Sequence, residues 1–374
     1  MNSKMSSSKK KLCFHCMKEV GTLKCVRCRT APYCSKECQV KHWPVHKNLC
    51  QDSNSDDTNE KLATKAFNYA RQGRPDKGEK VYRKLLARVN AELGENHPHT
   101  LGIQHNVATA LLDQGMFNDA AVLFKEGFEK RSLVLGPLHK DTLGSMHNLG
   151  CAISNSGNFV EGERVLRDCL EKRMREGGGL NSQWVLSTMF NLAITLDKQH
   201  KCTEAEVLFK QCLDKQRVVL GENHPSTFST MMNLGNCYLN SGKCREAEEI
   251  YTQCLNRQKK ILGENHPATL QTQMNLANAL TVLRKSDEAE KLLQQCHQKQ
   301  SVTGESSLDT MINLSVSYLV GGRYLEADKL LKECLDQMLT SGKLEYTVRI
   351  LELIERVYSA LGKTFDAAEI LGLR

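Results

Sequence analysis

The sequence predicts an all-α protein in which about eight helical hairpins stack into a solenoid behind a small cysteine-rich module. Three observations predict this fold. Seven cysteines crowd into residues 13–50 of a chain of 374 residues. A polar, acidic segment follows at residues 51–59. From residue 60 to residue 374, three sequence patterns recur in step with one another, about once every 42 residues.

The composition is that of a globular protein rather than a disordered one, with 40% hydrophobic and 25% charged residues. No apolar run approaches the roughly 18 residues that a membrane helix needs. The N-terminal sequence is polar and basic, unlike a secretory signal. We therefore expect a protein of the cytoplasm or nucleus, neither secreted nor membrane-bound. In such a reducing compartment, 16 cysteines indicate metal binding or burial rather than disulfides.

The net charge of +8 is concentrated at the N-terminal end. Residues 1–50 hold eleven Lys and Arg residues against Glu19 and Glu37, and the rest of the chain carries a net charge of −1. Residues 1–12 form the predicted flexible basic tail. A basic segment can meet acidic protein or nucleic acid, but a solvated lysine surface is the simpler interpretation. We therefore do not expect nucleic acid as a partner.

The repeat is visible in three registers. The loop phrase Gly-Glu-Asn-His-Pro starts at Gly94, Gly221 and Gly263, with degenerate copies at Gly136 and Gly304. An Asn-Leu-Gly or Asn-Leu-Ala phrase, or a relative of it, starts at Asn106, Asn148, Asn191, Asn233, Asn275 and Asn313. A small residue follows each asparagine fourteen positions later, at Ala120, Gly162, Ala205, Ala247, Ala289 and Ala327. Gly78 and Ala367 extend this series at either end.

Each unit is predicted to be a helix, a turn and a second helix. Pro98, Pro225 and Pro267 stand where a first helical residue is expected, because proline suits that position. In one unit the first helix covers about residues 227–240, and the second starts near residues 243–247. Apolar residues recur at spacings of three and four in both helices. Two such helices cannot bury their apolar faces alone, so neighbouring hairpins must stack.

These registers resemble the tetratricopeptide repeat, in the variety found in kinesin light chains. The resemblance rests on the pairs Leu149-Gly150 and Leu234-Gly235, and on the step of about 42 residues with Gly-Glu-Asn-His-Pro between hairpins. It covers about residues 60–374 and implies a right-handed superhelical solenoid whose first helices line a concave groove. The tryptophan of the family is absent from the repeats. The loop at residues 176–182 has lost the His-Pro phrase, so we expect a more mobile connection there.

The cysteines of the array fit the same resemblance. The second small residue of the family, seven positions after the first, matches Cys169, Cys212, Cys254, Cys296 and Cys334. Free cysteine behaves as a small hydrophobe, so we predict that these side chains are buried between helices. The alternative is a redox or metal ladder. Equivalent residues of consecutive hairpins should lie about 8–10 Å apart, which is beyond the reach of a disulfide.

The N-terminal cysteines have metal-ligand spacing: Cys13-x2-Cys16-x8-Cys25-x2-Cys28-x5-Cys34-x3-Cys38-x7-His46-x3-Cys50. Each CxxC pair can bind one zinc ion with near-tetrahedral geometry. The x3 gaps place Cys34 with Cys38, and His46 with Cys50, one helical turn apart. Eight ligands divide into two four-ligand sites, which are structural because no coordination position stays open. A segment this short has almost no core, so two Zn²⁺ ions must supply its folding energy.

The same segment resembles the MYND finger, which also shares the phrases Ala31-Pro32-Tyr33-Cys34-Ser35 and His42-Trp43-Pro44-Val45-His46-Lys47. The resemblance implies a cross-braced module. One zinc ion would be held by Cys13, Cys16, Cys34 and Cys38, and the other by Cys25, Cys28, His46 and Cys50. His42, four residues after Cys38, is an alternative ligand, although the family pattern favours His46. Residues 51–59 then link the finger to the array.

The six repeated asparagines are the predicted peptide-binding residues, because in the resembling repeats their position lines the concave surface. Asparagine is a mediocre helix former, so its recurrence in mid-helix needs a reason. A carboxamide both donates and accepts hydrogen bonds, and a row of them could hold the main chain of an extended peptide. Asn236 and Asn278, three residues further on in two repeats, are additional candidates. The alternative is that these side chains cap or bridge neighbouring helices.

These features predict a protein–protein interaction scaffold that is not an enzyme. The array would bind an extended peptide or protein segment, and the finger a second protein, by analogy with MYND fingers a proline-rich peptide. One alternative is a relative of the lysine methyltransferases that combine SET and MYND modules, lacking the catalytic domain. Another is a nucleic-acid-associated regulator that uses the basic finger. We find no Gly-rich phosphate loop or nucleophile elbow in the sequence.

Overall fold

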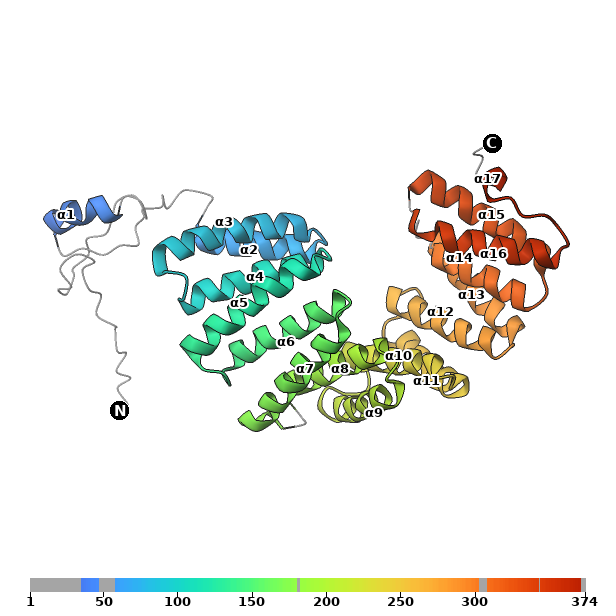
Figure 1. The fold of residues 1–374 in the computed structure, drawn as a ribbon, viewed down its shortest axis with the longest axis horizontal. Helices are drawn as coiled ribbons and strands as arrows, with labels where there is room; N and C mark the ends of the chain where they lie inside the picture. Colours follow the sequence, from blue (N-terminus) through green and yellow to red (C-terminus); the bar gives the residue numbers. More distant parts are fainter. Residues whose placement is uncertain (1–34, 47–57, 180–181, 303–307, 343, 371–374) are drawn as a thin grey trace, which may run out of the picture. The chain divides into compact units, whose positions relative to one another are not determined.

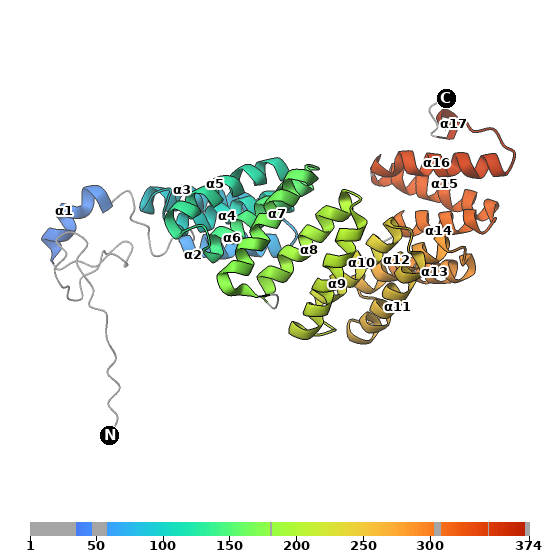
Figure 2. The same ribbon diagram turned by 60° about the horizontal axis from the view of Figure 1, so that its bottom comes forward.

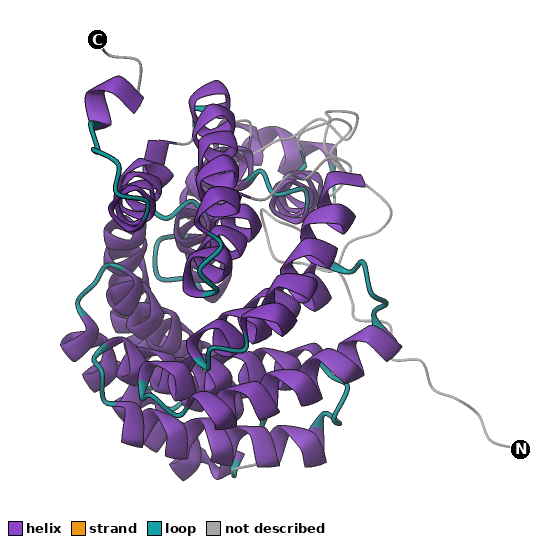
Figure 3. Cartoon of the chain, turned by 90° about the vertical axis from the view of Figure 1, so that its right-hand side faces the viewer, coloured by secondary structure: helices purple, strands orange, loops and turns teal. Residues whose placement is uncertain are grey.

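The computed structural model describes residues 35–46, 58–179, 182–302, 308–342 and 344–370. Within these ranges every regular element is helical, which confirms the predicted all-α class (Figure 3). Helix α1, Lys36–His46, belongs to the cysteine-rich module. The rest of that module, the basic tail and most of the 51–59 segment lie outside the described residues. The chain divides into two compact units, residues 1–157 and 158–374.

In the first unit the helices of the array pack on one another in chain order. They are α2 (Asn59–Arg71), α3 (Pro75–Leu93), α4 (Pro98–Asp113), α5 (Phe117–Leu135) and α6 (Lys140–Asn155). Each contacts the next along the chain, and α2 with α3 and α4 with α5 form hairpins (Figure 1). The first helix starts at Asn59 because the hydroxyl of Thr58 caps it, accepting from the Lys61 N–H at 3.3 Å.

The second unit continues the same sequential packing (Figure 2). Its helices are α7 (Phe159–Arg173), α8 (Gln183–Lys198), α9 (Cys202–Val219), α10 (Pro225–Asn240), α11 (Cys244–Ile261), α12 (Pro267–Val282), α13 (Ser286–Val302), α14 (Leu308–Val320), α15 (Tyr324–Ser341), α16 (Thr347–Ala360) and α17 (Ala367–Ile370). A π-helical turn, Met174–Gly178, follows α7, where the loop phrase is lost. A 3-10 turn, Leu344–Tyr346, precedes α16. Among the described helices, none is long and apolar enough to cross a membrane.

The loop phrase starts four of the first helices, α4, α6, α10 and α12, through local contacts. Its glycine has a positive φ, as at Gly221 with φ 93°, a region that other residues rarely adopt. Pro98, Pro225 and Pro267 are at the predicted helix starts. The preceding histidine accepts the N–H two residues on through Nδ1, at 3.1–3.2 Å in His97, His139, His224 and His266. Threonine hydroxyls donate to the loop glycine carbonyl at 2.8–2.9 Å, from Thr100, Thr142, Thr227 and Thr269.

The four histidines of the loop phrase have a capping role. Each one is the N-cap of its helix. A side-chain acceptor at this position satisfies one of the N–H groups that an α-helix leaves unpaired. This capping role could be predicted from the sequence, because the residue before a proline at the first helical position is the N-cap.

The helices of a hairpin meet at the predicted small residues. Ala120, Ala205, Ala247, Ala289 and Ala327 are fully buried, and so are Cys169, Cys212, Cys254, Cys296 and Cys334. Burial raises the pKa of these thiols to about 11, and to about 12 for Cys334, so they stay protonated at neutral pH. The described cysteines form no disulfide and no metal-ligand cluster. The packing interpretation of these cysteines is therefore the one that the structure supports.

Four carboxylates of the second unit join consecutive second helices. Glu163, Glu206, Glu248 and Glu290, here the interlock carboxylates, lie on α7, α9, α11 and α13. Each pairs with a basic residue at the start of the next second helix: Lys201, Lys243, Lys285 and Arg323, at 2.5–2.7 Å. Glu163 is the most fully bonded, since it also accepts from Arg167 at 2.8 Å and Gln199 at 2.7 Å.

The close contact between Gly235 and the Tyr251 ring leads to a prediction about stability. A Cβ added at Gly235 would come within 2.5 Å of two atoms of the buried Tyr251 ring. Overpacking of this kind costs about 1–3 kcal/mol. We expect Gly235→Ala to lower the free energy of unfolding by that amount in urea titrations. Gly102→Ala is the matched control, because a Cβ there meets no atom within 4 Å and alanine favours the helix by about 0.5–1 kcal/mol. Equal effects of the two substitutions would contradict the packing argument.

The bonds of Glu163 generate a pH prediction. Burial alone would raise its pKa, but hydrogen bonds from Lys201, Arg167 and Gln199 outweigh burial and hold the pKa at about 2. An unfolded glutamate titrates near 4.3, so ionised Glu163 stabilises the fold above about pH 4.3 and loses this contribution as pH falls toward 2.

We expect Glu163→Gln to lower the free energy of unfolding by about 2 kcal/mol at pH 7 and by much less at pH 2.5. Urea titrations of both proteins at several pH values measure this difference. Glu161→Gln is the control, since the exposed Glu161–Arg164 pair should contribute under about 1 kcal/mol. A difference between wild type and Glu163→Gln that does not change with pH would rule out the assignment.

Candidate functional site

The first helices of consecutive hairpins form a layer in each unit. In the second unit α8 contacts α10, α10 contacts α12, and α12 contacts α14. In the first unit α4 contacts α6. This first-helix layer carries all eight asparagines predicted to bind peptide. Asn106 is exposed, and Asn148, Asn191, Asn233, Asn236, Asn275, Asn278 and Asn313 are half-buried.

Most of the asparagines make hydrogen bonds within the layer. Asn191 and Asn233 donate from Nδ2 to the carbonyl oxygen one turn earlier in their own helices, at 3.1 and 2.9 Å. The Oδ1 of Asn275 accepts from Gln271 at 3.1 Å. The Oδ1 of Asn313 accepts from Arg349 at 3.3 Å. The bonds of Asn233, Asn275 and Asn313 each occupy one end of the amide, so local bonding and binding of a guest chain are compatible there.

In the first unit, Asn148 joins a buried network. Its Nδ2 lies 3.2 Å from Nε2 of His105. Arg131 of α5 is only 6% exposed and donates to the Leu101 carbonyl at 3.0 Å and to the Ser145 hydroxyl at 2.8 Å. Burial, and then the Arg131 charge, lower the pKa of His105 to about 4, so its ring is neutral at pH 7. Asn148 thus bridges neighbouring first helices, as the alternative interpretation of the asparagines proposes.

A hollow of about 250 Å³ lies between α8 and α10 in the second unit. Its lining residues are Ile194, Asp197 and Lys198 from α8, and Asn233, Asn236, Leu239 and Asn240 from α10. The Asn240 Nδ2 donates to Asp197 Oδ2 at 3.0 Å. The Tyr251 hydroxyl donates to Asn236 Oδ1 at 2.6 Å. This α8–α10 pocket brings together two predicted residues, Asn233 and Asn236.

Asp197 was not among the residues that the sequence predicted to bind peptide. It is the only acidic residue of α8, and α10 and α12 contain no charged residue at all. The scarcity of charge on α8, α10 and α12, where Asp197 is the only carboxylate, was the signal available in the sequence. What the sequence does not show is that this carboxylate and Asn240, 43 residues later, come together across two helices.

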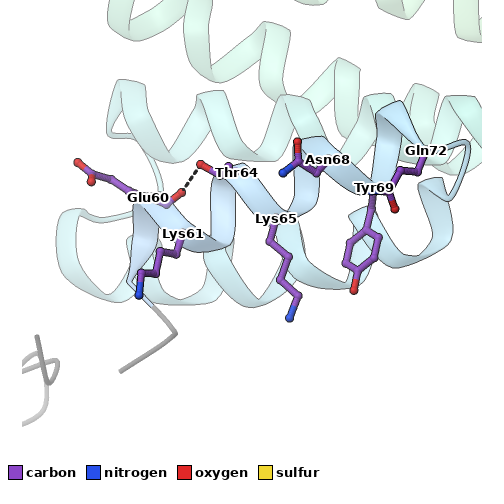
Figure 4. Close-up of a pocket in the computed structure, with 7 residues that line it drawn as sticks. All are labelled: Glu60, Lys61, Thr64, Lys65, Asn68, Tyr69 and Gln72. Atoms are coloured by element: carbon purple, nitrogen blue, oxygen red, sulfur yellow. Dashed lines mark hydrogen bonds between the residues drawn. The ribbon is translucent and has the colours of Figure 1, made fainter. Parts of the chain in front are cut away.

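A second hollow, of about 550 Å³, lies along α2 in the first unit (Figure 4). It is lined by Glu60, Lys61, Thr64, Lys65, Asn68, Tyr69 and Gln72, all from α2. Thr64 stands fourteen residues before Gly78 and therefore takes the position of the repeated asparagine in the first hairpin. Lys61, Lys65 and Tyr69 point to the same side of the helix. This hollow, with two lysines against Glu60, is therefore more basic than the α8–α10 pocket.

Of the predicted zinc ligands, only Cys38 has a described side chain. It is half-buried on α1, and its N–H donates to Ser35 Oγ at 3.2 Å. The backbone of His46 ends the same helix, and Cys13, Cys16, Cys25, Cys28, Cys34 and Cys50 lie outside the described residues. The helical rise separates Cys38 and His46 by about 12 Å along the axis. They are too far apart to share one ion, which agrees with their assignment to different zinc sites.

The donor set of the finger also suits zinc. Seven thiolates and an imidazole are the soft donors that Zn²⁺ prefers, and two sets of four match its coordination number. Cys38 would hold one ion and His46 the other, so α1 would connect the two sites. The ions would supply structure rather than reactivity, because four protein ligands leave no position for substrate.

Comparison with known families gives two matches. The tetratricopeptide repeat family matches residues 57–132, 198–260 and 226–299. The MYND finger family matches residues 13–50, the full length of the cysteine cluster. The finger and the repeats are both modules typical of protein interactions. The match to the MYND family implies that the finger binds two zinc ions.

Two curated relatives share shorter stretches. Tudor domain-containing protein 1 of Danio rerio is 41% identical over 61 residues, or 16% of this chain and 5% of that protein. N-lysine methyltransferase SMYD2-B of Danio rerio is 32% identical over 82 residues, or 22% of this chain and 16% of that protein. The chain thus matches only a small part of either relative.

Solved structures resemble most of the array. The nearly identical TPR-like repeats of a kinesin light chain-type protein from Podosopora anserina align with a TM-score of 0.51 and 27% identity, over 56% of this chain and 99% of theirs. A Rap protein complexed with competence and sporulation factor shares the fold at 13% identity, with a TM-score of 0.51 over 84% and 96% of the two chains. The chain is a MYND finger followed by tetratricopeptide repeats of the kind found in kinesin light chain-like proteins.

Proposed function

We propose that this chain is a non-enzymatic scaffold that holds two proteins. Its repeat array binds an extended peptide along the first-helix layer, and its finger binds a second protein. The observation that carries the first part is the α8–α10 pocket, where Asn233 and Asn236 of the repeated series line a hollow together with Asp197 and Asn240.

The chemistry of the layer supports a guest chain held by hydrogen bonds. Helices α10 and α12 present amides, hydroxyls and apolar side chains without a single charge. Such a surface suits the main chain of an extended peptide, which has one donor and one acceptor per residue. Each hydrogen bond contributes only about 0.5–1.5 kcal/mol, so affinity requires several in register. The repeat spacing supplies that register.

The Rap structure is consistent with this proposal, because an array of the same fold was solved in complex with competence and sporulation factor. For the finger, α1 presents Val40 and Trp43 with 65% and 37% of their surface exposed. An exposed aromatic beside an aliphatic side chain on a zinc-held module offers a surface for an apolar segment, such as a proline-rich peptide.

We expect no methyltransferase activity, although the chain shares 82 aligned residues with N-lysine methyltransferase SMYD2-B. That likeness covers 16% of the methyltransferase. Calorimetric titration of the full chain with S-adenosylmethionine should give no binding heat. A measurable affinity would favour the enzyme over the scaffold.

The asparagine series provides the test of the array. Peptides are selected from a random displayed library on the full chain, and the dissociation constant of the tightest is measured by fluorescence polarisation. The variant is Asn191→Ala, Asn233→Ala and Asn275→Ala combined. Loss of three hydrogen bonds should weaken binding about tenfold to a thousandfold.

The matched control changes three asparagines of the second helices, Asn90, Asn118 and Asn256, which are exposed. Alanine favours the helical state over asparagine, so neither triple variant should unfold. We expect the control to bind as wild type does. Equal affinity of the first variant and wild type would exclude the asparagine row as the binding surface.

The zinc assignment is tested by elemental analysis of the purified full chain. We expect two zinc ions per chain. Combining Cys13→Ser with Cys34→Ser should remove one ion, because both cysteines are assigned to the same site. Combining Cys13→Ser with Cys25→Ser should remove both. Cys151→Ser and Cys244→Ser in the array are controls that should retain two. Loss of both ions in the first double variant would contradict the crossed assignment.

A further inference from the structure

Asp197 differs from most other partly buried carboxylates of the second unit, and shares with Asp309 of α14 the lack of an ion pair with the described residues. The four interlock carboxylates each pair with a Lys or Arg at 2.5–2.7 Å, and Asp328 pairs with Lys332 at 2.9 Å. Among the described residues, no basic side chain lies within 4.0 Å of Asp197. Its Oδ2 accepts from Asn240, and its Oδ1 is shielded from solvent without a hydrogen-bond partner. Asp197 is therefore a pocket-lining carboxylate of the first-helix layer that has no ion pair among the described residues.

Two amides that line the pocket with Asp197, those of Asn233 and Asn240, each keep an acceptor. Asn233 contacts the Ser229 carbonyl oxygen, and Asn240 contacts the Asp197 carboxylate. A carbonyl oxygen and a carboxylate can only accept, so each asparagine must donate from its Nδ2. The oxygens of Asn233 and Asn240 are then left for a ligand. Together with Asp197 Oδ2, which already accepts from Asn240, they supply acceptors among the residues that line the pocket.

The negative charge of Asp197 contributes to raising the pKa of two neighbouring groups. Burial, followed by the Asp197 charge, raises the pKa of Cys237 to about 12. Burial, Cys254 and then Asp197 raise the pKa of the Tyr251 hydroxyl as well. Both groups therefore stay protonated and neutral at pH 7. Lys198, at the exposed edge of the pocket, forms no ion pair with Asp197, so the charge of the carboxylate remains available.

We propose that the α8–α10 pocket binds one basic side chain of the guest peptide, arginine in preference to lysine, on the acceptors of Asp197, Asn233 and Asn240. This inference rests on the proposed function of the array. A volume of about 250 Å³ suits a single side chain. A guanidinium presents five N–H donors in one plane and no acceptor, which matches several acceptors around one carboxylate better than an ammonium does.

The test uses random dodecamer peptides displayed on phage and selected on the full chain. We expect one position of the selected peptides to be enriched in arginine. The tightest peptide is then synthesised with arginine, lysine or citrulline at that position, citrulline being the neutral analogue of arginine. On wild type, citrulline should bind about tenfold to a hundredfold more weakly than arginine, the usual effect of a charge-assisted hydrogen bond.

Asp197→Asn is the informative variant, because asparagine has nearly the same size and can still accept from Asn240. On this variant the arginine and citrulline peptides should bind with similar affinity. Lys198→Gln should strengthen binding of the arginine peptide a few fold by removing repulsion. Asp214→Asn is the control, because it removes the same charge from a side chain of α9 that is 75% exposed and does not line the pocket. This variant should keep the preference for arginine.

The outcomes separate this inference from the proposed function. If peptides are selected and bind through the asparagine row, but show no arginine preference or keep it in Asp197→Asn, the inference fails and the proposed function stands. If no peptide is selected on the full chain, the proposed function fails and the inference fails with it. An arginine preference lost in Asp197→Asn and kept in Asp214→Asn supports both.

Discussion

The close approach of the two helices in each hairpin is the constraint on which the other features depend. It requires small side chains at two positions of the second helix, seven residues apart. Alanine occupies the first position in most repeats and cysteine the second, and these side chains are fully buried. A larger side chain at either position would push the helices apart. Every contact of the first-helix layer would then shift, including those around Asp197 and Asn233.

The loop phrase fixes where α4, α6, α10 and α12 begin, and so sets the position of the residues that these helices present. The glycine turns the chain, the histidine caps the helix, the proline starts it, and the threonine hydroxyl bonds back to the glycine carbonyl. These contacts are all local. They reproduce the same helix start in successive repeats, which places the asparagines at equivalent positions in the layer. A surface for an extended chain needs this regularity, because a peptide backbone repeats its donors and acceptors at constant intervals.

Charge is distributed differently on the two sides of the second unit. The carboxylates of the second helices are neutralised by basic residues of the next hairpin, and they hold the array together. The first helices α10 and α12 carry no charge, and α8 contributes Asp197 and Lys198 at its end. In the first unit, the hollow along α2 has two lysines instead. The chemistry of the layer thus changes along the array although its geometry repeats, which is how a regular scaffold can favour one guest sequence over another.

The sequence by itself determined the helical class, the hairpins, the small-residue packing and the zinc-finger module, because these follow from periodicity, spacing and local chemistry. Only the tertiary structure decided which polar groups meet. It showed that Asn148 joins His105, that Asn233 bonds to its own helix, and that Asp197 meets Asn240 in a pocket. The physical reason is that repeat spacing predicts which residues share a face, whereas a hydrogen bond depends on side-chain direction and on distances of a few tenths of an ångström across two helices.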